Sequence, residues 1–180
     1  MTTRYVALLR GINVGGHHKV PMPELKTEMK NLGFENIQTL LNSGNVLFEN
    51  SGTDSSQLEE SISKHLETVF GFPIPVILRE SDLILQLVQN NPFKDIAMTK
   101  DIRLYVSFLK KESSVKLTLP WSTEYGAYRI LDVRDRTICS VLNLAVSQSP
   151  KAMDSLEQQF GKDITTRNWN TILKIAEKWT

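Results

Sequence analysis

Five consecutive apolar residues near the N-terminus place the strongest limit on how this chain can fold. Residues 5–9 read Tyr-Val-Ala-Leu-Leu, so an extended strand here is apolar on both faces. Such a strand lies in the middle of a sheet that is covered, at least in part, on both sides. Arg10 closes the run, which is too short for the hydrophobic segment of a signal peptide. The sequence therefore predicts a central strand over residues 4–10, followed by a polar, glycine-rich loop.

The segments that follow have the order of one small α+β unit. The expected segments are a helix at residues 23–33, strands at 37–41 and 46–48 around a tight turn, a helix from the cap residue Asp54 to Phe70, and a strand at 74–78. With the first strand, this order is β-α-β-β-α-β, which is that of the ferredoxin-like fold. The sequence therefore predicts a ferredoxin-like half with an antiparallel sheet of strand order 4-1-3-2 over residues 1–79.

The second half, residues 80–180, has a less regular pattern. The expected segments are a short helix from Ser81, a half-buried strand at 102–108, a hairpin of 127–133 with 137–142, a helix from Ser149 and Pro150 to Gly161, and a last helix capped by Asn168. Residues 111–123 are ambiguous. If residues 112–119 form a helix, this half is a second, degraded ferredoxin-like unit, and we expect it to pack against the first. The duplication rests on element order, because we find no convincing sequence repeat.

Composition narrows the class of protein. The 21 basic and 20 acidic side chains balance, which argues against a dedicated DNA-binding protein. Cys139 is the single cysteine, so no intramolecular disulfide can form and a reducing compartment is expected.

No stretch approaches the ~20 apolar residues of a membrane helix. We therefore expect a soluble, cytoplasmic protein that does not associate with membranes, and no spacing of His, Cys and Asp suggests a metal site.

Two motifs at the ends of the chain resemble a known family. The first half contains ALLRGINVGGHHKVPMPELK and LGFENIQTLLNSGNVLF, and the last part contains ITTRNWNTILK. In these motifs the chain is similar to the domain-of-unknown-function family 1697. Asn42 stands where a glutamine is typical of that family, and His17 and His18 occupy variable loop positions. The resemblance implies an α/β fold built from ferredoxin-like halves, and it implies no activity.

The expected topology brings the 10–19 loop and the 43–45 turn to one sheet edge, where the first helix also begins. Glycine-rich loops, a helix N-terminus and two cations suit an anion such as a phosphate, a nucleotide or a carboxylate. The candidate ligand-binding residues are Arg10, Asn13, Gly15, Gly16, Lys19, Ser43, Gly44 and Asn45. The alternative is that the glycines serve only the turns and that Asn13 bonds the loop to itself. Arg167, before the cap residue Asn168, joins this site if it reaches the edge, and otherwise has a structural role.

Other signals of chemistry are weak. Gly11 and Gly16 have P-loop spacing, but His17 and His18 replace the required Lys-Ser/Thr pair. Cys139 fits a buried, inert thiol better than a nucleophile. The sequence identifies no catalytic residue and no cofactor, and whether the chain is an enzyme stays open.

Three classes of function remain. The first is binding of a small anionic ligand at the loop and turn. The second, single-stranded nucleic-acid binding, is disfavoured because the two central strands offer only Tyr5 and Phe48 for base stacking. The third is a dimerisation or protein-contact module without catalysis, and nothing in the sequence specifically indicates a homo-oligomer.

Overall fold

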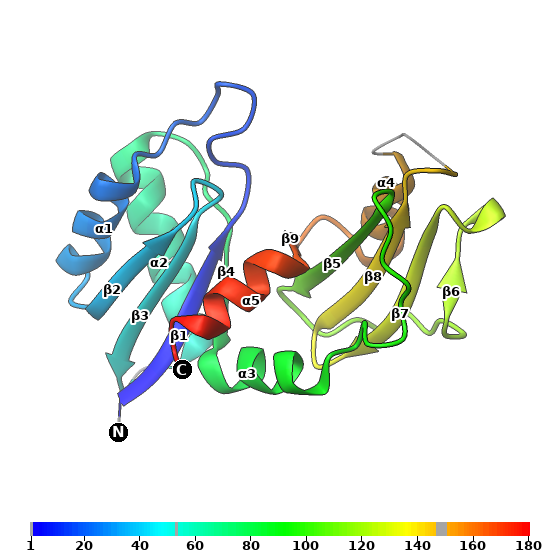
Figure 1. Ribbon diagram of the computed structural model, residues 1–180. Helices are drawn as coiled ribbons and strands as arrows, with labels where there is room; N and C mark the ends of the chain where they lie inside the picture. Colours follow the sequence, from blue (N-terminus) through cyan, green and yellow to red (C-terminus); the bar gives the residue numbers. More distant parts are fainter. Residues whose placement is uncertain (1, 53, 147–150) are drawn as a thin grey trace. The chain divides into compact units, whose positions relative to one another are not determined.

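The computed structural model describes residues 2–52, 54–146 and 151–180. The chain divides into two compact units, shown in Figure 1. The first unit consists of residues 1–85 together with residues 175–180, and the second unit consists of residues 86–174.

The first unit contains a four-stranded sheet in which every neighbouring pair is antiparallel. Its elements are β1 (Thr2–Leu9), α1 (Met22–Asn31), β2 (Glu35–Leu40), β3 (Asn45–Ser51), α2 (Ser55–Phe70) and β4 (Val76–Glu80). The strand order is β2-β3-β1-β4, so β1 pairs with β3 on one side and with β4 on the other. The doubly apolar first strand is therefore central, as its sequence predicts.

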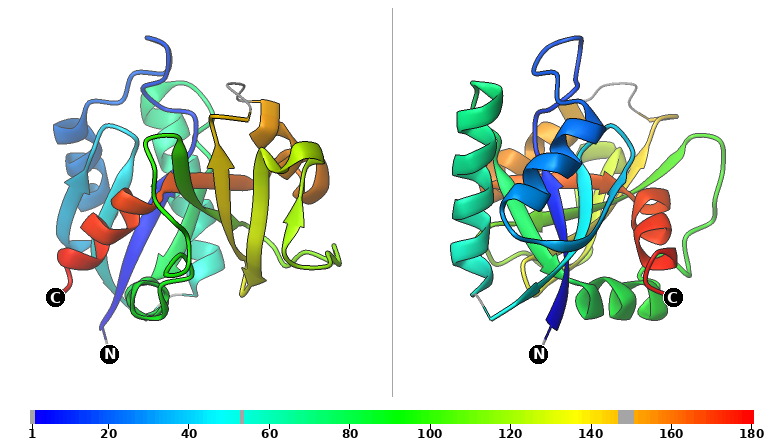
Figure 2. Two further views of the ribbon diagram at one scale, coloured as in Figure 1. Left: turned by 45° about the vertical axis from the view of Figure 1, so that its right-hand side comes forward. Right: turned by 90° about the vertical axis from the view of Figure 1, so that its left-hand side faces the viewer.

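Both helices of this unit pack against one face of the sheet. Ala7 and Leu9 of β1 and Phe48 of β3 share a core with the buried helical residues Leu25, Met29, Ile62 and Leu66. These helical residues recur four positions apart, which places them on one side of each helix. Residues 175–180, at the end of the chain, lie on the face of the sheet opposite to α2 (Figure 2).

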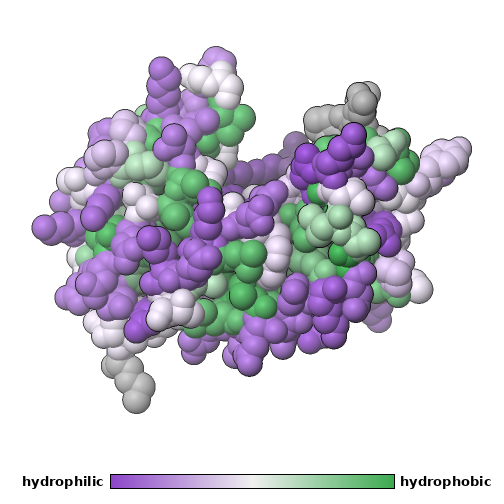
Figure 3. All heavy atoms as spheres, in the orientation of Figure 1, coloured by the Kyte–Doolittle hydropathy of each residue, from purple (hydrophilic) through white to green (hydrophobic). Residues whose placement is uncertain are grey.

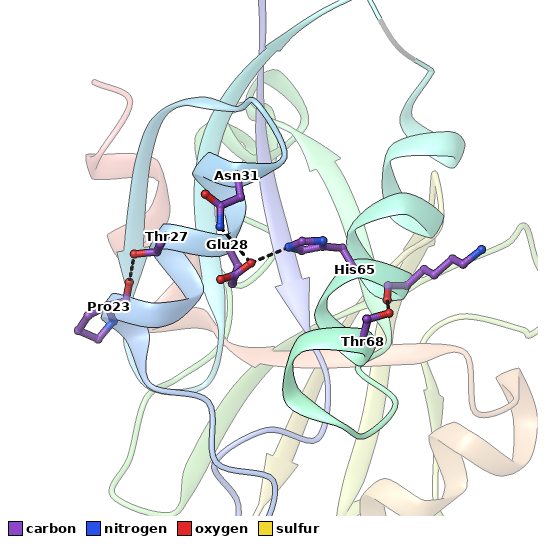
Figure 4. A network of polar contacts seen from close by, with 7 residues as sticks. Pro23, Thr27, Glu28, Asn31, His65 and Thr68 are labelled. Atoms are coloured by element: carbon purple, nitrogen blue, oxygen red, sulfur yellow. Dashed lines mark hydrogen bonds and ion pairs between the residues drawn. The ribbon is translucent and has the colours of Figure 1, made fainter.

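Polar contacts fix the ends and the pairing of the two helices. Asp54 caps α2 by accepting a hydrogen bond from the backbone N–H of Ser56, and the hydrogen bonds from Ser56 lower the pKa of the Asp54 carboxyl. Gly71 ends α2 in the left-handed conformation, with φ +80°. Between the helices, Glu28 Oε2 of α1 lies 2.8 Å from His65 Nε2 of α2 (Figure 4).

The second unit contains a five-stranded antiparallel sheet. Its elements are β5 (Ile102–Leu109), β6 (Trp121–Ser122), the short 3-10 helix η1 (Glu124–Gly126), β7 (Tyr128–Arg134), β8 (Thr137–Asn143), α4 (Lys151–Phe160) and β9 (Ile164–Asn168). α3 (Ser81–Asn90) and α5 (Trp169–Glu177) each have residues in both units. The sheet order is β6-β7-β8-β5-β9. The chain is thus a mixed α+β protein with two antiparallel sheets.

The second half settles one segment that the sequence left ambiguous and contains one strand that the sequence did not predict. Residues 112–118 form no helix, because serine, valine and threonine are weak helix formers and Pro120 disfavours the helical conformation at Leu119. Residues 164–168 form a strand that the sequence analysis did not predict, paired with β5 along its whole length. The expected helix start at Ser149 and Pro150 lies outside the described residues, whereas α4 does end before Gly161 as predicted.

The two sheets share a strand order once β6 is set aside. The order β7-β8-β5-β9 corresponds to β2-β3-β1-β4, with β5 in the place of β1 and β9 in the place of β4. The registers also correspond, because Val6 faces Arg79 across β1 and β4, and Val106 faces Arg167 across β5 and β9. Each unit therefore carries a buried arginine at the penultimate position of its last sheet strand.

Candidate functional site

The glycine-rich loop is a small hairpin. Val14 and His17 form an isolated antiparallel bridge, and the Asn13 N–H donates to the His18 carbonyl at 3.0 Å. Between them, Gly15 and Gly16 have φ +58° and +79°, as the two central residues of a tight hairpin turn require. These two glycines therefore serve the turn.

Asn13 joins this loop to the 42–45 turn. Its Nδ2 donates to the carbonyls of Val20 at 3.0 Å and of Asn42 at 2.8 Å, and its Oδ1 accepts from the Val20 N–H at 2.8 Å. All three partners are backbone groups, one of them 29 residues away in sequence. The loop and the turn thus meet at one edge of the sheet, and Asn13 holds them together.

The turn itself is packed closely against the end of β1. The Leu9 N–H donates to the Gly44 carbonyl at 2.8 Å. A Cβ atom at Gly44 would lie 2.8 Å from Leu9 Cβ and 2.7 Å from Ile12 Cδ1, so no other residue fits without a shift. Asn45 is fully buried, and its Nδ2 donates to the Leu40 carbonyl and the Ser43 hydroxyl. These hydrogen bonds close the hairpin.

A hollow of about 380 Å³ lies beside this junction, and we call it the loop hollow. Its lining residues are Asn13, Gly16, Lys19, Val20, Pro21, Met22 and Asn42. Lys19 is exposed and brings a positive charge. The start of α1 also borders the hollow through Pro21 and Met22, and Pro21, the N-cap, makes no side-chain capping bond.

The expected site residues are only partly brought together. Asn13, Gly16 and Lys19 line the loop hollow, whereas Arg10, Gly15 and the 43–45 turn do not. Arg10 is half-buried, and its backbone N–H donates to the Pro75 carbonyl at 2.9 Å. Three further lining residues are not predicted by the sequence pattern: Pro21, Met22 and Asn42. The proline-flanked helix start does signal that a helix end lies there.

Arg167 lies in the second unit, on β9. It is buried, and its Nη1 donates to the Thr165 hydroxyl at 2.8 Å and to the Thr166 carbonyl at 3.0 Å. Burial lowers the pKa of its guanidinium to about 10. Next to it, Asn168 Oδ1 accepts from the Asn170 N–H at the start of α5, and the Trp169 ring packs edge-on against Phe93. The expected capping role of Asn168 is thus confirmed.

Cys139 is buried on β8, and its burial raises the pKa of the thiol to about 12. Because the thiolate is the reactive form, we expect Ellman's reagent to modify the folded protein at least ~100-fold more slowly than the protein unfolded in denaturant. The measurement is the rate of absorbance change at mildly alkaline pH. Modification at similar rates in the two states would contradict a buried, inert thiol.

Two further features bear on the class of site. In the described part of the chain, no group of three or more His, Cys, Asp or Glu side chains is placed to hold a metal ion. Among the helices of residues 2–52, 54–146 and 151–180, none is long and apolar enough to cross a membrane.

Fold and site together describe an α+β protein with two antiparallel sheets and a hollow at a loop–turn junction. The chain belongs to the family described as "Protein of unknown function (DUF1697)", whose sequence profile matches residues 1–138. Its structure is similar to that of the conserved bacterial protein SP0830 from Streptococcus pneumoniae, with 25% identity and a TM-score of 0.74 over 99% of this chain and 98% of that one. No curated protein matches significantly.

Proposed function

We propose that this protein binds a small anionic ligand, such as a phosphate or a carboxylate, in the loop hollow. The observation that carries the proposal is the position of Lys19 beside the first turn of α1. A helix N-terminus carries partial positive charge and N–H groups without acceptors in the helix, and a nearby ammonium adds to its attraction for anions.

The geometry limits which groups take part. Pro23 has no N–H, so the first turn offers only the N–H groups of Met22 and Glu24 as donors near the hollow. The Asn13 amide is already bonded to Val20 and Asn42, which makes it a support of the site. Lys19 therefore replaces Arg10 as the principal cation of the proposed site.

Single-stranded nucleic-acid binding has less support. Tyr5 and Phe48, the aromatic residues of the two central strands, stack on each other with ring centroids 5.6 Å apart. Both are buried in the core under α1 and α2. Neither ring is available to stack on a base.

The test is Lys19→Ala, read by thermal melting with inorganic phosphate, nucleotides and simple carboxylates. We expect an anion that binds to raise the Tm of the wild type with the logarithm of its concentration. Lys19→Ala should melt at the wild-type temperature without ligand, because Lys19 is exposed, and should lose most of the shift. Lys64→Ala, an exposed site on α2, is the matched control and should keep it. Equal shifts in all three proteins, or no shift with any anion, would contradict the proposal.

A further inference from the structure

A groove of about 920 Å³ runs along β2 in the first unit, and it is separate from the loop hollow. Its lining includes the four consecutive residues 35–38 of β2. Successive residues of a strand point to opposite faces of a sheet. A cavity that touches four in a row therefore follows the outer edge of the strand, and we call it the edge groove.

β2 has a strand on one side only in the described part of the sheet. It stands at the end of the order β2-β3-β1-β4 and pairs with β3. The outer side of such a strand presents backbone N–H and C=O groups that a further extended chain can pair with. The register shifts between Glu35 and Gln38, and Asn36 has φ +51°, so the strand carries a bulge at this edge.

Basic side chains flank the groove on both faces of the sheet. Lys26 and Lys30 are exposed and lie one turn apart on α1, which covers the same face as Tyr5. Arg4 precedes Tyr5 on β1 and therefore lies on the opposite face, where its Nη1 donates to the Trp179 carbonyl at 3.5 Å. Lys178 adds a fourth cation to the lining.

The acidic residues of the groove do not balance these cations. The lining contains Glu35 and Glu49 against four basic side chains. The Glu49 carboxylate already interacts with Arg4 Nε at 3.5 Å and accepts from Asn36 Nδ2 at 2.7 Å. Beyond this pair, the lining holds Lys26, Lys30 and Lys178 against Glu35. Figure 3 shows hydrophilic residues with apolar ones between them over this part of the first unit. The groove thus complements an anionic partner.

We propose that the edge groove binds an acidic, extended peptide segment, which adds to β2 as a further strand. Backbone pairing with β2 provides affinity without regard to sequence. Carboxylates on alternate sides of the added strand then face Lys26 and Lys30 on one face and Lys178 on the other. This proposal does not depend on anion binding in the loop hollow.

The bulge in β2 and the lysines beside it can also have a protective role, which predicts that no peptide binds. Bulges and lysines at edge strands also prevent pairing with other chains. If that is their only role, no peptide binds. The other conceivable occupants are a second copy of this chain, paired edge to edge, and a single-stranded nucleic acid held by the lysines.

The binding test uses a short fluorescent peptide in which pairs of glutamates alternate with valine and threonine, measured by anisotropy at low ionic strength. We expect micromolar affinity for this peptide and none for its counterpart with lysine in place of glutamate. Lys26→Glu combined with Lys30→Glu should weaken binding roughly tenfold or more. Lys64→Glu reverses an exposed charge on α2 outside the groove and should change affinity less than about twofold. Thermal melting of each variant verifies that it is folded.

A second measurement separates strand pairing from attraction between charges. Residues of a strand direct their N–H groups alternately to the two sides. N-methylation of one alternate set of peptide amides should therefore abolish binding, whereas methylation of the other set should be tolerated. Equal binding of both methylated peptides would overturn strand addition, and so would tighter binding of oligo(dT) than of the acidic peptide. Absence of binding up to about 1 mM peptide, or a dimer that Lys26→Glu with Lys30→Glu dissociates, would also overturn it.

Discussion

Replacing Gly44 by alanine is expected to lower the free energy of unfolding by about 2–5 kcal/mol, which is a large part of the stability of a typical domain. Two effects add. Gly44 has φ +77°, a conformation that costs an alanine about 1–2 kcal/mol. The new methyl group would also lie 2.8 Å from Leu9 Cβ and 2.7 Å from Ile12 Cδ1, and overpacking of this kind typically costs about 1–3 kcal/mol.

Gly15→Ala separates the two effects. Gly15 has a similar φ of +58°, but no atom lies within 4 Å of the position that its Cβ would take. This variant should therefore show only the conformational cost, about 1–2 kcal/mol. Both values come from urea unfolding followed by circular dichroism. Equal destabilisation of the two variants would mean that the turn does not press against β1 as the structure describes.

The sequence was most informative where hydrophobic pattern and cap residues agree. The apolar run at residues 5–9 requires two neighbouring strands, and in a unit of four strands this leaves few possible orders. Asp54 and Gly71 mark the ends of α2 with side-chain and backbone chemistry that acts locally. Local signals of this kind can be read without knowledge of the tertiary structure.

The second unit was harder to predict because its signals are not local. The segment of residues 164–168 is short, and its residues are polar apart from Ile164. It forms a strand because it pairs with β5, more than 50 positions earlier in the chain. A signal was nevertheless present. Residues 5–10 read YVALLR and residues 105–110 read YVSFLK, and the first five residues of each lie in the equivalent strands β1 and β5. The similarity of these two segments indicates that the second half has a strand equivalent to β1. A last strand that pairs with it, as β4 pairs with β1, is then expected as well.

The location of the candidate site at the sheet edge could be predicted from the sequence, but the residues that line it could not. The topology alone brings the end of β1 beside the start of β3, which explains why the loop and the turn meet. Which residues line the hollow depends on the hydrogen bonds and the burial of each side chain, and the spacing of residues in the sequence does not reveal these. Asn45, for example, is buried and donates hydrogen bonds to Leu40 and Ser43, whereas Lys19 is exposed.

The largest pH-dependent effect is expected for Asn13→Asp, which should lose about 2–4 kcal/mol of stability at neutral pH. Aspartate tolerates the φ of +55° at this position about as well as asparagine does. The change is therefore mainly electrostatic. Carboxylate oxygen would replace the Nδ2 donor and face the carbonyl oxygens of Val20 and Asn42 at about 3 Å, where asparagine now bonds to both.

Because the charged form is disfavoured in the folded state, the pKa of this aspartate should rise above its value in the unfolded chain. A protonated carboxyl can donate one hydrogen bond, so the destabilisation should be smallest below the unfolded pKa and should grow as pH rises through the folded pKa. Urea unfolding of the variant and the wild type at about pH 4 and pH 8 measures the difference at each pH. Asn42→Asp places a carboxylate on a neighbouring exposed side chain and should show little of this dependence. A destabilisation by Asn13→Asp that stays constant between the two pH values, or that matches Asn42→Asp, would show that Asn13 does not hold the loop to the turn.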